Sequence, residues 1–406
     1  MFNSIQLFGL VLLGGLLAGE LARRLCALPR TTGYVLFGLL IGQSGLQWVT
    51  PLHIESAQLF IDLALGLILF ELGYLVPRSS PQSGRRRLLA GSLLSLLAGL
   101  LVLLLFVSWG FSVGSALFAA ALCLATSPAI TIATCSDVGA RGERTGLLYS
   151  MVAINGAAAF ALVVMLVPFL IDSQPLSIFQ RVSGALGSIF GSLLLGGACA
   201  GLVLLGVDKL EKQAEHHHLL ILGCIVLGVG TAIYLDISVF LPMLVFGLLV
   251  SNIDREQKVI ALRIASDARV FLVITFVLAG AALDIAYLRD YWFPALLIAL
   301  ARFAGQLFSL LLCRRELGLS PKEVVLMTVG LQPMSSIALV LLVNTQLLYS
   351  GMEAELVGML MATILLMQLF GPFATQTAIK GFGEATRLRG RQQSVAEAPT
   401  TGGGYG

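Results

Sequence analysis

Charged side chains are scarce in this sequence. Asp, Glu, Lys and Arg make up only 12% of its 406 residues, while hydrophobic residues make up 57%. Apolar runs of about 15 to 25 residues recur from end to end, which is the length that a bilayer-spanning helix needs. A soluble domain has no use for so many such runs. The composition therefore excludes a soluble protein and indicates an α-helical protein that crosses the lipid bilayer many times.

Several chemical signatures are also missing. The sequence has no Walker A motif, no dinucleotide-binding fingerprint, no CxxC pair and no His/Cys spacing typical of a metal site. We therefore expect no enzyme activity, no cofactor and no bound metal. The net charge of +3 reflects basic loops, so no nucleic-acid partner is expected. Disulfides are not expected either, because all six cysteines lie within apolar runs or near their ends: Cys26, Cys123, Cys135, Cys199, Cys224 and Cys313.

Thirteen membrane spans are expected from the apolar runs. We expect residues 1–376 to form one transmembrane domain, and residues 377–406, which are polar and Gly-rich, to form a disordered cytoplasmic tail. The spans cover roughly residues 5–22, 32–48, 57–76, 88–109, 113–135, 145–171, 183–207, 218–235, 237–251, 270–286, 291–313, 323–345 and 355–376.

The basic residues alternate from one side of the membrane to the other. All but three of the 25 Lys and Arg residues fall in the loops of one side or in the tail. Arg181 and Arg289 lie in the opposite loops, and Arg302 lies inside a span. Because basic loops stay in the cytoplasm, we expect the N-terminus outside and the C-terminus inside. The expected location is a plasma membrane of the bacterial (inner) type, with the first span retained rather than removed as a signal peptide.

Two of the spans contain a proline with polar neighbours at depth. The fifth includes LATSPAITIATCSD and the twelfth includes VGLQPMSSIALVLL. Proline removes a backbone donor and frees carbonyls, and such breaks in transporters bind ions or solutes near the bilayer midplane. The alternative is an ordinary kink patched by nearby hydroxyls. The candidate site residues in these breaks are Thr126, Ser127, Pro128, Gln332, Pro333, Ser335 and Ser336.

The two breaks lie seven spans apart, so the broken spans run in opposite directions, as an inverted repeat requires. Asn155 in span six and Arg302 in span eleven fall at a similar depth, within about one or two helical turns of the bilayer middle. A cation buried at that depth is a functional candidate. It is equally a structural one, because a guanidinium can bond the free carbonyls of broken helices. The sequence leaves both roles open.

Five stretches in this order resemble the membrane domain of the second monovalent cation/proton antiporter family, over residues 5 to about 376. The resemblance implies a sodium/proton antiporter-like fold with a dimerising panel (spans 1–3 and 8–10), a mobile core (spans 4–6 and 11–13) and span 7 as a linker. It also implies a homodimer and an elevator-like movement of the core. The stretches are LPRTTGYVLFGLLIG (28–42), IDLALGLILFELGYLVP (61–77), ATSPA (125–129), VFLPMLVFGLLVSN (239–252) and ARVFLVITFVLAGAALDI (268–285).

The sequence departs from the family at one position. Family members usually have an aspartate after the residue that matches Asn155, and it binds the cation and the proton in turn; here that residue is Gly156. Proton exchange then needs another titrating group, and Glu71 is a possible relay, although a carboxylate at the inner interface near Arg78 is the plainer interpretation. Glu20 is expected to pair locally with the arginines three and four residues later.

Three functions remain open at this stage. The first is a secondary antiporter that exchanges a monovalent cation (Na⁺, K⁺ or Li⁺) for protons. The second is a transporter of a small anion on the same fold, which would use Arg302, the N-termini of the half-helices and the neutral groups of Gln332, Ser335 and Ser336. The third is a sensor or scaffold that transports nothing.

Overall fold

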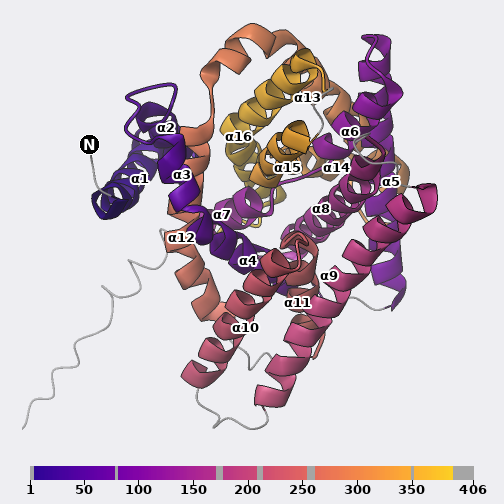
Figure 1. The fold of residues 1–406 in the computed structure, drawn as a ribbon. Coiled ribbons are helices and arrows are strands. Elements are labelled where there is room, and N and C mark those ends of the chain that lie inside the picture. The colour runs from indigo at the N-terminus through magenta and orange to yellow at the C-terminus, as the bar shows by residue number, and fades with distance from the viewer. Residues whose placement is uncertain are drawn as a thin grey trace, which may run out of the picture.

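In the computed structural model, residues 4–77, 81–170, 177–207, 214–253, 261–348 and 352–386 are described, and they form an all-α bundle (Figure 1). The helices of these residues are α1 (Ser4–Cys26), α2 (Arg30–Ile41), α3 (Pro51–Ser56), α4 (Gln58–Leu75), α5 (Pro81–Ser108), α6 (Val113–Cys123), α7 (Pro128–Val138), α8 (Glu143–Leu170), α9 (Ile178–Val207), α10 (Ala214–Tyr234), α11 (Phe240–Ile253), α12 (Ala261–Ala282), α13 (Ile285–Cys313), α14 (Pro321–Gly330), α15 (Ser336–Leu348) and α16 (Ala354–Phe382).

The thirteen expected spans are all present as helices. Eleven of them match one helix each, the fifth is α6 with α7, and the twelfth is α14 with α15. Within the described residues, eight helices are long and apolar enough to cross a membrane, and several shorter apolar helices accompany them. The remaining helix, α3, was not expected from the sequence; it is a single short turn that begins at Pro51 after the capping residue Thr50.

Several span boundaries differ from the expectation, and two of these differences have a clear local reason. Span two ends at Ile41 rather than at 48, because the chain turns at Gly42, where an added β-carbon would lie 2.3 Å from the Cα of Ala281. Helix α13 begins at Ile285 rather than at 291. Its backbone is non-helical at Tyr291, one turn before Pro294, so its first turns are set off from the apolar segment by a kink.

The tail predicted from residue 377 is wrong in its first ten residues. Helix α16 continues to Phe382, and Gly383 ends it in the left-handed conformation with φ of 76°. The carboxylate of Glu384 then accepts hydrogen bonds from the backbone N–H of Arg144 (2.9 Å) and of Thr145 (2.7 Å) at the start of α8. This segment is therefore tied to the bundle by contacts that its polar composition does not reveal. The rest of the predicted tail, residues 387–406, lies outside the described residues.

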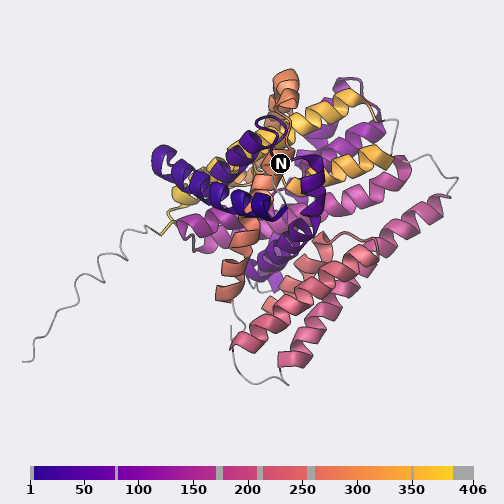
Figure 2. The same ribbon diagram turned by 60° about the vertical axis from the view of Figure 1, so that its left-hand side comes forward.

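The helices pack in two groups (Figures 1 and 2). The first, here called the panel, contains α1, α2, α4, α10, α11 and α12; the second, here called the core, contains α5 to α8 and α13 to α16. Helix α9 packs on α8, α10 and α11, and so contacts both groups. In the panel, α2 packs on α12 and α4 packs on α11; in the core, α5 packs on α13. In each of these pairs, one helix comes from the first half of the chain and the other from the second half, which is the pattern of an inverted repeat.

Close approach at the two panel contacts depends on paired glycines. A β-carbon at Gly38 would lie 2.1 Å from the carbonyl oxygen of Val277, and one at Gly280 would lie 2.3 Å from that of Val35. The equivalent contact of α4 with α11 uses Gly73 and Gly247 in the same way, with distances of 2.3 Å and 2.1 Å to opposing carbonyls. Small residues at helix contacts let backbones meet in a membrane, where no hydrophobic effect drives helices together.

Candidate functional site

The two broken spans cross each other at their breaks. Each has an extended stretch between two half-helices, and the two stretches lie antiparallel, with an isolated bridge between Thr126 and Met334. The N–H of Ser127 donates to the carbonyl of Pro333 at 2.9 Å, and the N–H of Ser335 donates to the carbonyl of Ala125 at 3.0 Å. The expected pair of discontinuous crossing helices is confirmed. Each break satisfies part of the other's exposed backbone, as burial in a membrane requires.

The sequence Thr-Ser-Pro at residues 126–128 determines where α7 begins. Ser127 is the N-cap, and its hydroxyl accepts a hydrogen bond from the N–H of Ile130 at 3.3 Å. Pro128 occupies the first helical position, where its missing N–H costs nothing and its fixed φ suits the helix. The hydroxyl of Thr131 donates to the carbonyl of Ser127 at 2.9 Å. Ser127 and Pro128 therefore set where the half-helix begins.

Arg302 is fully buried, and it donates hydrogen bonds to the C-terminal end of α14, the first half-helix of the second broken span. Its Nη2 donates to the carbonyl of Leu331 at 3.1 Å and to the hydroxyl of Thr126 at 3.2 Å, and its Nη1 donates to the carbonyl of Gln332. A positive charge at the C-terminal end of α14 matches both the unpaired carbonyls and the helix dipole there. The guanidinium thus fills the structural role that the sequence left open. Its Nε has no hydrogen-bond partner among the described residues.

Asn155 joins the same network from α8. Its Nδ2 donates to the hydroxyl of Thr126 at 3.4 Å, and its Oδ1 accepts from the hydroxyl of Ser95 at 2.9 Å. The hydroxyl of Thr126 is thus approached by both Arg302 and Asn155, from α13 and α8. The structure brings these three predicted residues together in a buried centre. Within the described residues, every hydrogen-bond partner found for Arg302 and Asn155 is a neutral group.

The space beside Gly156 is filled by an aromatic ring. A β-carbon at this position would lie 2.4 Å from the Cζ atom of Phe240, which comes from α11 of the panel. Phe240 is buried and stacks with Phe160, one turn further along α8, with ring centroids 6.2 Å apart. The position at which the resemblance implies a carboxylate therefore has neither the charge nor the room for one in this arrangement.

The remaining candidates of the second break lie in or next to the same centre. Gln332 donates from its Nε2 to the carbonyl of Thr328 at 2.9 Å and to the Oε1 of Gln306 at 2.8 Å. Pro333 is buried against Gly371 of α16, where an added β-carbon would lie 2.8 Å from the proline Cα. Ser335 contributes the backbone N–H already described. Ser336 begins α15, and its side chain lies outside the described part of the chain.

Glu71, the proposed relay, lies in a different part of the structure. It lines a cavity of about 520 Å³ between α7 of the core and the panel helices α1, α2, α4 and α12. Two further carboxylates, those of Glu20 and Asp137, line the same cavity. Across the described residues, no three His, Cys, Asp or Glu side chains are grouped as a metal site would need.

A family model described as the transmembrane part of the sodium/hydrogen exchanger matches residues 8–380. The chain belongs to the sodium/hydrogen exchanger family. This match covers the panel, the core and the crossing, and it confirms the resemblance found in the sequence. A search of curated proteins found no significant match.

Solved structures with the same fold include two of a sodium/proton antiporter. A structure of the sodium/proton antiporter MjNhaP1 from Methanocaldococcus jannaschii at pH 8 is 19% identical, covers 95% of this chain and 99% of its own, and superposes with a TM-score of 0.71. An electron-microscopy map of the same antiporter gives 19% identity, the same coverage and a TM-score of 0.70. At this identity the likeness establishes the fold.

Four buried polar residues of this sodium/hydrogen exchanger family member were not predicted from its sequence. Gln306 is fully buried one turn after Arg302, and that spacing on one helix face was the available signal. The hydroxyl of Thr375 donates to the carbonyl of Gly330 at 3.1 Å, next to the second break. Ser95 and Gln368 are also buried, but each is a single polar residue in an apolar helix, and nothing in the sequence aims it at the centre.

Proposed function

We propose that this protein is a secondary active transporter that exchanges a monovalent cation (Na⁺, K⁺ or Li⁺) for protons across a membrane. The observation that supports this most is the crossing of two broken helices with Arg302 and Asn155 at its centre. Half-helix ends at such a crossing present dipoles and backbone groups to an ion near the midplane. Family membership and the fold point to the same class of transport.

The core and the panel are proposed to move against each other in an elevator-like manner, within a homodimer whose contacts the panel supplies. The candidate site for the solute consists of residues of the crossing and its neighbours: Thr126, Ser127, Pro128, Asn155, Gly156, Arg302, Gln332, Pro333, Ser335 and Ser336. The N-terminus is proposed to lie outside and the C-terminus in the cytoplasm of a bacterial-type inner membrane, because the basic residues alternate in that sense.

Coupling to protons must come from a group other than residue 156. Glycine cannot titrate, so the proton is assigned to a carboxylate outside the crossing, with Glu71 as the relay. The proposal of an anionic solute held by Arg302 loses its support at the same time. Both terminal nitrogens of that guanidinium already donate to backbone carbonyls, so an anion would have to displace bonds that hold the broken helix.

The test is transport by purified protein in liposomes with a pH-sensitive dye inside. Pulses of sodium, potassium or lithium chloride should move protons in a cation-dependent manner, and protein-free liposomes should not respond. Replacing chloride by gluconate should leave the response unchanged if the cation is the solute. A response that follows the anion, or no response to any of the three cations, would overturn the proposal.

A further inference from the structure

The cavity that contains Glu71 lies between the two groups of helices. Its core side is one face of α7, with Ile132, Ala133, Ser136 and Asp137, and its other walls are α1, α2, α4 and α12 of the panel. Its volume of about 520 Å³ is several times that of a water molecule, so a hydrated ion fits inside it. Any sliding of the core along the panel changes the shape of this space.

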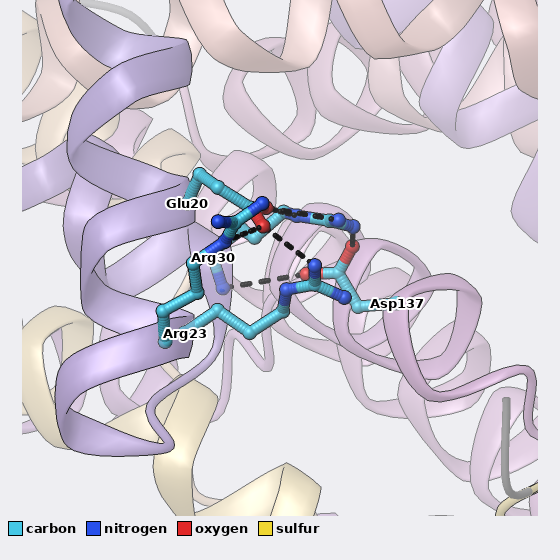
Figure 3. A network of polar contacts seen from close by, with 5 residues as sticks. Glu20, Arg23, Arg30 and Asp137 are labelled. Carbon is cyan, nitrogen blue, oxygen red and sulfur yellow. Dashed lines mark hydrogen bonds and ion pairs between the residues drawn. The ribbon is translucent and has the colours of Figure 1, made fainter. Parts of the chain in front are cut away.

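An ion-pair network that includes Glu20, Arg30 and Asp137 forms part of the cavity wall (Figure 3). The Nη1 of Arg30 lies 3.0 Å from the Oδ1 of Asp137, and its Nη2 lies 3.2 Å from the Oε2 of Glu20. Arg23 and Arg24 pair with the other oxygen of Glu20 at 2.6 Å and 2.7 Å, as expected from their spacing. The guanidinium of Arg30 on α2 therefore links the panel to the core, and it holds the carboxylates of Glu20 and Asp137 in place.

Glu71 brings a further carboxylate to the wall formed by α4. Among the side chains that the structure describes, the titratable or charged groups that line the cavity with it are Glu20 of α1, Arg30 and Tyr34 of α2, and Asp137 of α7. Tyr149 of α8 also lies within electrostatic reach of Glu71. Glu71 is thus a panel carboxylate with groups of both α7 and α8 in its surroundings.

Thr31 adds a buried hydroxyl group to the cavity wall. Thr31 is 1% exposed and lines the same cavity, and its hydroxyl has no hydrogen-bond partner among the described residues. A buried hydroxyl left without a partner costs about 1–3 kcal/mol, so such groups are normally satisfied. Alkali-metal cations, like other hard cations, bind oxygen ligands such as those of hydroxyl and carboxylate groups.

We propose that this cavity binds a monovalent cation and a proton in competition, with the Glu71 carboxylate as the titrating group and the Thr31 hydroxyl as a neutral ligand. The inference rests on the proposed antiport, and it names the site that takes over the exchange which Gly156 cannot perform. One carboxylate that accepts either a proton or a cation is the minimum that such an exchange needs. The Arg30–Asp137 pair positions the core side of the site.

The direct test is proton release from purified full-length protein in detergent with little buffer. Sodium chloride should displace protons from the wild type, and choline chloride should not. Glu71→Gln should abolish the release, while Asp62→Asn, a carboxylate near the outer end of the same helix, should leave it unchanged. Thr31→Val should raise the half-saturating sodium concentration about tenfold, because the loss of one ligand contact is expected to weaken binding about as much as the loss of one hydrogen bond.

Thr32→Val is the matched control for Thr31→Val, because Thr32 is also buried, its hydroxyl has no partner within the described ranges, and it is not among the residues that line the cavity. Size-exclusion profiles and melting temperatures would verify that all variants are folded. Sodium-dependent release that persists in folded Glu71→Gln, or equal effects of the two threonine changes, would overturn the inference. Transport assays in liposomes distinguish a failure of this inference from a failure of the proposed function. If cation/proton exchange survives Glu71→Gln, the protein is an antiporter but this cavity is not its site. If sodium releases protons from the protein but no exchange occurs in liposomes, the site exists but the protein is not an antiporter.

Discussion

The ring of Phe240 occupies the space that a side chain at residue 156 would need, with its Cζ atom 2.4 Å from the position of an added β-carbon. The two residues belong to different groups of helices, since Gly156 lies in α8 of the core and Phe240 in α11 of the panel. Because residue 156 is a glycine with no side chain, the ring of Phe240 can pack directly against the backbone of α8.

Enlarging residue 156 should destabilise the protein through this contact. Gly156→Ala is expected to lower the free energy of unfolding by about 1–3 kcal/mol, because overpacking forces the ring of Phe240 to move. Gly197→Ala in α9, where an added β-carbon meets nothing within 4 Å, should have little effect. In a double-mutant cycle, Phe240→Ala should remove the cost of Gly156→Ala. Additive effects on the melting temperature in detergent would contradict this contact.

Arg302→Ala should be strongly destabilising. The carbonyls of Leu331 and Gln332 and the hydroxyl of Thr126 would all lose a donor in a buried centre. Each unsatisfied buried group costs about 1–3 kcal/mol, so a loss of about 3 kcal/mol or more is expected. Arg302→Lys should recover only part of it, because an ammonium cannot span three acceptors as a planar guanidinium does.

The control for Arg302 is Arg289→Ala, which removes an exposed ion pair with Asp290 and should leave the melting temperature nearly unchanged. Thermal melting in detergent measures both. If Arg302→Ala is as stable as the wild type but no longer transports, the guanidinium acts on the solute rather than on the broken helix.

Thr126→Val should weaken the centre more than an exposed threonine change does. Its hydroxyl accepts from Asn155 and Arg302, and valine would leave both donors without that partner. The expected loss is about 1–3 kcal/mol. Thr377→Val is the matched control, because that hydroxyl is exposed and donates to the carbonyl one turn before it on α16. Equal melting temperatures for the two variants would contradict the bridging role of Thr126.

Glu384→Gln should loosen the start of α8. The carboxylate accepts from the N–H of Arg144 and from both the N–H and the hydroxyl of Thr145, the last at 2.6 Å. It therefore acts as a cap supplied from a distance, and losing its charge should cost about 0.5–2 kcal/mol locally. Hydrogen exchange in the first turn of α8 should accelerate in this variant and stay unchanged in Glu355→Gln, which alters an exposed carboxylate at the other end of α16. Unchanged exchange in Glu384→Gln would show that the cap contributes little.

The sequence was sufficient for the spans and for the breaks within two of them. Membrane spans are long apolar runs, and an unbroken helix at membrane depth poorly accommodates a proline flanked by Ser, Thr or Gln. Pro128 and Pro333, together with their polar neighbours, therefore marked the crossing. Arg302 was equally visible, because a lone cation in an apolar helix requires partners.

Other features depended on contacts between distant segments. Phe240 is an ordinary aromatic residue in its own helix, and only the packing of α11 on α8 places it beside Gly156. The position of Glu384 at the start of α8 joins residues 240 apart in the chain, and a polar tail gives no sign of it. The unpartnered hydroxyl of Thr31 is a property of its surroundings, so no sequence pattern could indicate it.

The joint between Ser127 and Pro333 is made of main-chain atoms, and so is the one between Ser335 and Ala125. Side-chain replacement leaves such a joint intact unless a proline removes one of the two donors. Substitutions can therefore change the chemistry around the crossing while the scaffold stays assembled. In a fold built this way, the means of holding two half-helices together and the means of holding an ion are free to diverge.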